Sequence, residues 1–75
     1  MHERTLARMA EGEHALIREI HVPDPERVRL FGLGVLPGVN ITVLRNGRRA
    51  LIVEAARTCL VLARPLAESI LMEEA

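Results

Sequence analysis

Alternating hydrophobic and polar positions predict short β-strands along most of this chain. The clearest alternation lies in residues 39–45, where Val39, Ile41 and Val43 alternate with Asn40 and Thr42. Such a pattern is typical of a strand with one buried face. Asn46 and Gly47 follow, a pair that favours a two-residue type I′ turn. Residues 48–53 then return the chain, so we predict an antiparallel hairpin that turns at this pair.

Two more strands are indicated on either side of the hairpin. Residues 14–20 are rich in branched apolar side chains, but Ile20 has the opposite parity to Ala15 and Ile17. Either a bulge turns Ile20 inward or the strand is covered on both sides, and we favour the bulge. Residues 58–62 predict the other strand, after a tight corner in the chain.

A helix is predicted between the first strand and the hairpin. Asp24 can act as the N-cap acceptor, and Pro25 suits the first helical position because no amide hydrogen bond is lost there. The helix should run to about Leu33, with Gly34 in the left-handed C-terminal cap and Pro37 preventing continuation. The apolar side chains within it, led by Val28 and Phe31, are expected to pack the helix onto the barrel.

The remaining elements complete a mainly β fold. Pro65 should open a one-turn helix near the C-terminus, and residues 70–72 should form a last strand. About five short strands with one inserted helix predict a small, partly open barrel of the all-β class. A chain of 75 residues is too short for two cores, so we expect residues 1–75 to form a single domain.

Charge and aromatic content narrow the class of ligand. The ten basic residues are all arginine and are balanced by ten acidic residues, which leaves no broad field for gathering phosphates. Phe31 is the single aromatic residue. Barrels that bind single-stranded nucleic acid or proline-rich peptides rely on several aromatic platforms. We therefore expect a protein partner and no nucleic acid.

The chain also lacks the features of an exported or membrane-inserted protein. Its N-terminus has no apolar leader, and one cysteine cannot form an internal disulfide. The longest stretch without a charge, residues 30–44, is short and is broken by glycine and proline. We expect a cytoplasmic protein that does not insert directly into a membrane.

Metal binding and catalysis find little support in the spacing of reactive residues. His14 and His21 have opposite parity on their strand, and Cys59 has no second ligand near it in sequence. No glycine-rich phosphate loop or nucleophile elbow is present, and Cys59 is expected to be a small buried hydrophobic residue. We therefore predict no metal site, no cofactor, no catalytic residue and no enzymatic activity.

A candidate partner-binding patch lies at the predicted hairpin tip. With a two-residue turn, Arg45 would face Arg48 and Leu44 would face Arg49, while further along Ile41 would lie opposite Ile52. Leu36, in the turn after the helix, lacks periodic apolar partners. The predicted patch comprises Leu36, Leu44, Arg45, Arg48 and Arg49, because arginine beside leucine is a composition that interfaces favour.

The segment from Arg29 to Gly38 carries a family resemblance. It has Arg29 and Leu30, then Phe31 and Gly32, and then Leu33, Gly34, Val35, Leu36, Pro37 and Gly38. This pattern resembles that of the FeoA family, and so do outlying positions at Leu6, Met9, Gly12, Leu62, Ala67 and Ile70. Two features depart from it: the hairpin loop is short, and Arg57 stands where the family commonly has glycine.

The resemblance implies an SH3-like barrel that is not catalytic and acts on FeoB, the membrane GTPase permease for ferrous iron. A second reading is a free-standing regulatory barrel related to the C-terminal domain of DtxR-type metalloregulators. Such a regulator needs a winged helix, but only about a dozen residues precede the first predicted strand. A homo-oligomeric interaction module remains a third reading.

Overall fold

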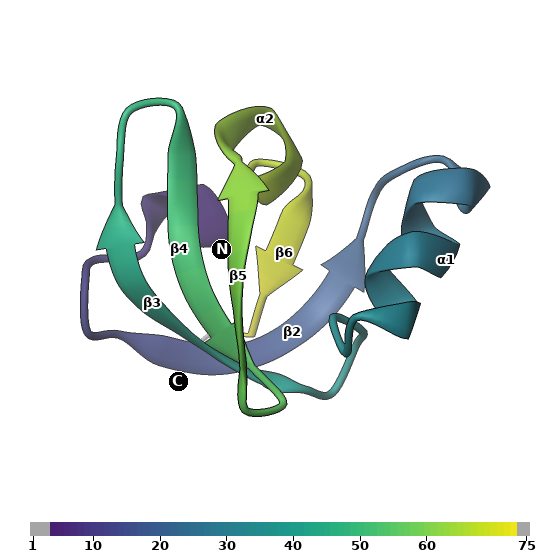
Figure 1. Cartoon of the computed structure of the whole chain (residues 1–75), viewed down its shortest axis with the longest axis horizontal. Coiled ribbons are helices and arrows are strands. Elements are labelled where there is room, and N and C mark those ends of the chain that lie inside the picture. Colours follow the sequence, from purple (N-terminus) through teal and green to yellow (C-terminus); the bar gives the residue numbers. More distant parts are fainter. Residues whose placement is uncertain (1–3, 74–75) are drawn as a thin grey trace.

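A computed structural model describes residues 4–73 of the chain, which form a curled sheet with two α-helices and one 3₁₀ helix (Figure 1). The elements are β1 (Arg4–Thr5), η1 (Leu6–Arg8), β2 (His14–Ile20), α1 (Asp24–Gly32), β3 (Asn40–Asn46), β4 (Ala50–Ala55), β5 (Thr58–Ala63), α2 (Arg64–Ala67) and β6 (Ile70–Met72). No helix within this part of the chain is both long and apolar enough to cross a bilayer.

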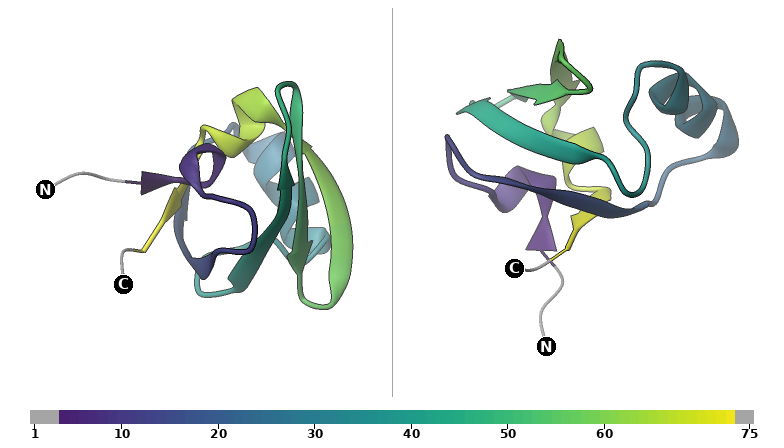
Figure 2. Two further views of the ribbon diagram at one scale, coloured as in Figure 1. Left: turned by 90° about the vertical axis from the view of Figure 1, so that its left-hand side faces the viewer. Right: turned by 90° about the horizontal axis from the view of Figure 1, so that it is seen from below.

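The sheet has the strand order β1-β6-β2-β3-β4-β5, and all of its pairings are antiparallel. β1 and β5 are its two edges, so the barrel is not closed (Figure 2). This confirms the predicted fold class, with a sixth strand because residues 4–5 pair with β6. The inner face of the curl buries the core, whose fully buried large side chains are Leu6, Met9, Ile17, Val35, Ile41, Val43, Leu51, Val53, Ile70 and Met72.

The bulge predicted in β2 is confirmed. Ile17 lies opposite Met72, whereas Glu19 lies opposite Leu71, so one residue of β2 is extra at this point. The shift turns Ile20 inward, and both Ile17 and Ile20 are buried. The bulge therefore reconciles the parity conflict in the sequence and bends β2 around the core.

The predicted register of the β3–β4 hairpin is wrong. Ile41 lies opposite Ala55 rather than Ile52, and Ile52 pairs with Arg45. Two features cause the difference. A bulge inserts Leu44 into β3, and the chain turns over residues 47–49. The turn is not type I′, because neither central residue of the predicted pair has the left-handed conformation that this turn needs.

Gly47 is nevertheless required for a steric reason. Its amide donates a hydrogen bond to the Ala50 carbonyl at 3.0 Å. A Cβ atom at Gly47 would lie only 2.8 Å from that carbonyl oxygen. Any side chain at this position would therefore push the loop apart.

The tight two-residue turn lies instead between β4 and β5. Ala55 pairs with Thr58, and the two residues between them, Ala56 and Arg57, have φ angles of 51° and 65°. Both are left-handed without being glycine, asparagine or aspartate, so each is strained by roughly 1 kcal/mol. The tight corner predicted before the strand at residues 58–62 is confirmed.

Helix α1 has the predicted extent but a different start. Pro23 occupies the N-cap position, and the Asp24 side chain makes no cap hydrogen bond. Asp24 instead pairs with Arg27 one turn along the helix. The predicted left-handed cap is confirmed at Gly34, with φ of +92°. The cap directs the following residue, Val35, into the core.

The predicted packing of α1 through Val28 and Phe31 is wrong. Val28 is 68% exposed and Phe31 is 41% exposed, while Leu30 is the residue of this helix that is buried. Figure 1 shows α1 standing beside the barrel rather than across its mouth. The helix therefore presents apolar surface to solvent.

Candidate functional site

The structure separates the predicted partner-binding residues into two places. Leu44, Arg45, Arg48 and Arg49 lie in and beside the β3–β4 connection, and we call this group the arginine tip. Leu36 is half-buried and precedes β3, at the other end of that strand. Seven residues of strand at about 3.3 Å each place Leu36 roughly 20 Å from the tip, so it does not belong to the same patch.

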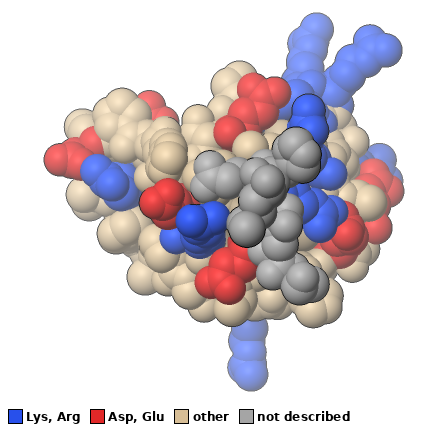
Figure 3. All heavy atoms as spheres, turned by 180° about the vertical axis from the view of Figure 1, so that it is seen from behind, with Lys and Arg blue, Asp and Glu red and all other residues tan. Residues whose placement is uncertain are grey.

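All four residues of the arginine tip are exposed. Leu44, the extra residue of the β3 bulge, is 47% exposed. Within residues 4–73, no ion pair or side-chain hydrogen bond engages the guanidinium groups of Arg45, Arg48 or Arg49. Seen from behind, basic side chains project past the outline of the molecule at the β3–β4 end (Figure 3).

Arg64, the first residue of α2, holds the loop that carries these arginines. Its Nε donates to the carbonyl oxygens of Gly47 at 3.2 Å and Arg48 at 3.0 Å. Its NH2 group donates to the Gly47 carbonyl at 2.7 Å and to the side-chain oxygen of Asn46. Its NH1 group reaches the Ala7 carbonyl at 3.3 Å. One side chain therefore joins the loop to the N-terminal 3₁₀ helix.

Asn46 strengthens the same junction. Its Nδ2 donates to the carbonyl oxygens of Ala7 at 3.0 Å and Met9 at 2.8 Å, and its backbone amide donates to the Glu11 carboxylate at 3.1 Å. The sequence predicts a turn role for this residue. Its observed role depends on partners more than 30 positions away in the chain, and no local pattern signals them. The loop bearing the arginines is therefore fixed and not freely mobile.

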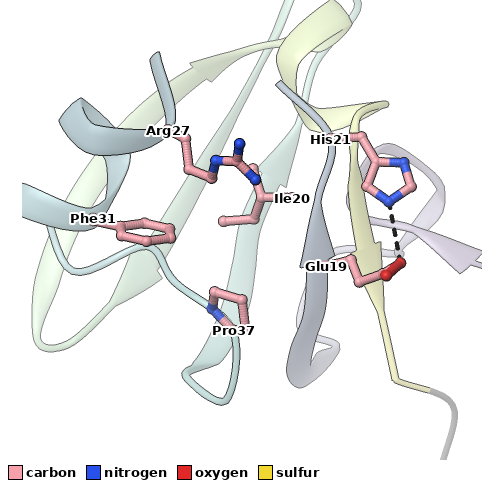
Figure 4. Close-up of a pocket in the computed structure, with 6 residues that line it drawn as sticks. All are labelled: Glu19, Ile20, His21, Arg27, Phe31 and Pro37. Carbon is pink, nitrogen blue, oxygen red and sulfur yellow. Dashed lines mark hydrogen bonds and ion pairs between the residues drawn. The ribbon is translucent and has the colours of Figure 1, made fainter. Parts of the chain in front are cut away.

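A hollow of about 300 Å³ lies beside α1, at the C-terminal end of β2 (Figure 4). Its lining residues are Glu19, Ile20, His21, Arg27, Phe31 and Pro37. The His21 ring nitrogen and the Glu19 carboxylate lie 3.1 Å apart at its rim. The Phe31 ring, Ile20 and Pro37 supply apolar surface, and Glu19, His21 and Arg27 supply ionisable groups. The aromatic residue was predicted to be buried, and sequence reasoning missed this site.

The possible metal ligands are dispersed. Among residues 4–73, no group of three or more histidine, cysteine, aspartate or glutamate side chains is arranged to hold a metal ion. His14 contacts Asn40 at 3.4 Å and lies at the other end of β2 from His21. The expectation that Cys59 is buried is wrong, because its side chain is exposed on β5. His2 lies outside the described residues.

Glu13 carries a shifted pKa near the start of β2. Its carboxylate accepts a hydrogen bond from the Ala10 amide at 2.6 Å and pairs with Arg4. The amide hydrogen bond, followed by the nearby guanidinium, holds the pKa of Glu13 below its ordinary value of 4.5. This pair joins β1 to the turn before β2, away from the arginine tip.

The chain matches a protein-family model, and its fold matches those of solved structures. Residues 4–74 match the FeoA domain model. A crystal structure described as iron uptake regulatory protein (FeoA) superposes with a TM-score of 0.88 at 20% identity, covering 99% of this chain and 100% of that one. The FeoA of Stenotrophomonas maltophilia in complex with zinc, described as an SH3 domain protein, has a TM-score of 0.75 at 21% identity, covering 93% and 89%.

A regulatory protein also shares the fold. A manganese-dependent transcriptional repressor superposes with a TM-score of 0.84 at 20% identity, covering 97% of this chain. The chain spans 42% of that repressor's length. No curated protein sequence matches the chain. The structural likenesses establish the SH3-like barrel.

Proposed function

Because this chain belongs to the FeoA domain family, whose model matches residues 4–74, we propose that it is a cytoplasmic accessory protein of ferrous iron uptake. In this role it binds and modulates a FeoB-type membrane GTPase permease. Binding rather than catalysis suits the chemistry of the barrel. Residues 4–73 include no buried polar or charged side chain, so nothing there is desolvated in the way that tunes a catalytic group.

The arginine tip is the proposed docking surface, and the observation that carries it is the way Arg64 fixes the loop. Exposed arginines on a mobile loop would lose conformational freedom on binding, which weakens an interface. Here the loop carbonyls of Gly47 and Arg48 are already held by Arg64. The backbone amide of Arg64 also donates to the Arg49 carbonyl at 2.8 Å. The guanidinium groups of Arg48 and Arg49 are therefore presented from a pre-organised backbone.

The composition of the tip indicates the chemistry of its partner surface. Arginine is enriched among the residues that dominate binding energy, and its planar fork pairs with carboxylates in two parallel hydrogen bonds. Leu44 adds an exposed apolar contact beside the charges. The partner surface should therefore combine acidic side chains with an apolar depression. The hollow beside α1 lies at the far end of β2 and is a second place where one apolar side chain could dock.

The test is calorimetric titration against the cytosolic GTPase part of a FeoB-type protein. Wild type is compared with Arg48→Glu/Arg49→Glu, and the matched control is Arg29→Glu/Arg57→Glu, which reverses the same charge at two other exposed arginines. We expect the tip variant to bind at least about tenfold more weakly, because each desolvated arginine contributes about 2 kcal/mol. The control should stay within about twofold of wild type.

Each part of the proposal can fail separately. If wild type does not bind, the functional proposal is wrong. If wild type binds and the tip variant binds equally well, the docking surface is wrong while the function stands. A Phe31→Asp variant then tests the hollow beside α1.

A second candidate function rests on the likeness to the manganese-dependent repressor. In that reading the chain is a free-standing regulatory barrel of the kind found at the C-terminal end of DtxR-type metalloregulators. Association with a repressor in place of the permease part, measured in the same titration format, would favour it. A homo-oligomeric interaction module is the remaining alternative.

A further inference from the structure

β5 forms an open edge of the sheet. The strand Thr58–Ala63 pairs with β4 on one side, and it is the last strand in the sheet order. In the left view of Figure 2 it lies at the outer margin of the molecule. An edge strand carries a row of backbone N–H and C=O groups that can pair with another chain.

The hairpin geometry determines which backbone groups face outward. A two-residue turn makes Ala55 and Thr58 a hydrogen-bonded pair, and alternation then directs Leu60 and Leu62 toward β4 as well. The N–H and C=O groups of the intervening residues, Cys59, Val61 and Ala63, point away from β4. Outside the ladder and the helices, no backbone hydrogen bond engages them within residues 4–73. Ala63 is also the N-cap of α2, so its C=O accepts the first hydrogen bond of that helix, while its N–H remains available. All three residues are exposed, and Val61 is 71% exposed.

This edge has none of the protection that edge strands usually carry. Proteins blunt exposed edges with charged side chains, proline or a bulge. Residues 58–63 contain no charge and no proline, and the register with β4 is unbroken from Ala50 to Ala55. An uncharged strand can also meet an identical strand without repulsion between like charges.

We propose that two copies of this chain associate by antiparallel pairing of their β5 strands, independently of the function proposed above. The direction follows from charge. Ala63 lies beside the arginine tip because it pairs with Ala50. Antiparallel pairing sends the two tips to opposite ends of the joint sheet, whereas parallel pairing would bring them together.

The register follows from the outward-facing groups. Placing Val61 on the two-fold axis sets it against Val61 of the second copy and sets Cys59 against Ala63. The Val61 pair then exchanges two hydrogen bonds, and the Ala63 amide of each copy donates to the Cys59 carbonyl of the other, giving about four interchain hydrogen bonds. The two valines meet on the outer face, beside Ile52 of β4 in each copy. The joined sheet therefore carries an uninterrupted apolar strip across its centre.

A strand-only interface is small, which sets the expected strength. Such a contact lies below the roughly 1,200 Å² of a standard interface, so the dissociation constant should be on the order of 100 μM. Sedimentation equilibrium from about 10 μM to 1 mM should then show the average mass rising from 8.3 kDa toward twice that value.

Two variants test the edge specifically. Val61→Arg places two like charges on the axis and should weaken the dimer at least about tenfold. Val28→Arg is the matched control, because Val28 is 68% exposed on α1 and carries the same change away from β5. It should dimerise like wild type. Far-UV circular dichroism confirms that each variant is folded.

Amide hydrogen exchange of the wild type supplies a readout that depends on no variant. At about 1 mM, mass action leaves roughly one fifth of the chains monomeric, so the amides of Val61 and Ala63 should exchange about fivefold more slowly than in dilute solution. Those of Leu60 and Leu62, already bonded to β4, should change much less. A chain that stays monomeric to 1 mM, or a dimer that protects another surface, would overturn the proposal.

Discussion

Replacing Arg64 with methionine keeps an unbranched side chain with an apolar stem. It removes every guanidinium hydrogen bond at the junction between the β3–β4 loop and the N-terminal 3₁₀ helix. Four acceptors lose the guanidinium donor: the carbonyl oxygens of Ala7, Gly47 and Arg48, and the side-chain oxygen of Asn46. The Ala7 carbonyl still accepts from Asn46 Nδ2. Methionine has no group that can replace these bonds.

The size of the effect follows from which acceptors water can reach. Arg48 is exposed, so its carbonyl oxygen can be hydrated after the substitution. Gly47 and Asn46 are half-buried, and hydrogen bonds to charged donors contribute about 1.5–3 kcal/mol each. Losing two such bonds lowers the free energy of unfolding by about 3 kcal/mol, which corresponds to roughly 15 °C in Tm for a chain of this size.

Urea denaturation followed by far-UV circular dichroism measures this change, because the chain has no tryptophan or tyrosine for fluorescence. Arg45→Met is the matched control and should stay within about 0.5 kcal/mol of wild type, since Arg45 is exposed. Arg64→Lys should fall between the two because a single ammonium cannot span all four acceptors. A midpoint for Arg64→Met equal to that of the control would refute the role assigned to this side chain.

Two further predictions concern the β4–β5 turn and the dependence of the free energy of unfolding on pH below neutrality. Replacing Ala56 by Asn and Arg57 by Gly should raise the free energy of unfolding by about 1–2 kcal/mol, because both positions are left-handed; an unchanged or lower urea midpoint would contradict this. The Glu13 pKa is lowered in the folded state, so this residue stabilises the fold above pH 4.5 and loses that contribution as pH falls through the folded-state pKa. Wild type should therefore exceed Glu13→Gln in stability at pH 7, and the difference should shrink below pH 4.5; a constant difference down to pH 2 would assign the effect to packing instead.

The elements of the fold were largely predictable because each has a local cause. The alternation in β3, the parity break at Ile20 and the glycine cap at position 34 all depend on neighbouring residues, and the structure confirms each of them. Asn46 shows where local rules stop. Its preference for a turn was outweighed by hydrogen bonds to Ala7 and Met9, which are distant in sequence.

Burial was less predictable than secondary structure. Helical spacing placed Val28 and Phe31 on one face of α1, but it could not show whether another layer covers that face, and both side chains are exposed while Leu30 is buried. Cys59 was misplaced for the same reason, since an apolar edge strand has one face without a neighbour. The arginines of the tip were identified from sequence because they are close together in the chain. Their anchor, Arg64, was not.

The position of β6 has a consequence for how the chain folds as it is made. β6 is the last strand in sequence but lies inside the sheet, between β1 and β2, and all three of its residues are buried. During synthesis, the strands on either side of it have no partner for these edges until residues 70–72 have emerged. Pairing between segments so distant in sequence is slow, because loop-closure entropy must be overcome first. The nascent barrel therefore remains open along one seam until translation passes Met72, and this seam is where a chaperone would find exposed strand edges.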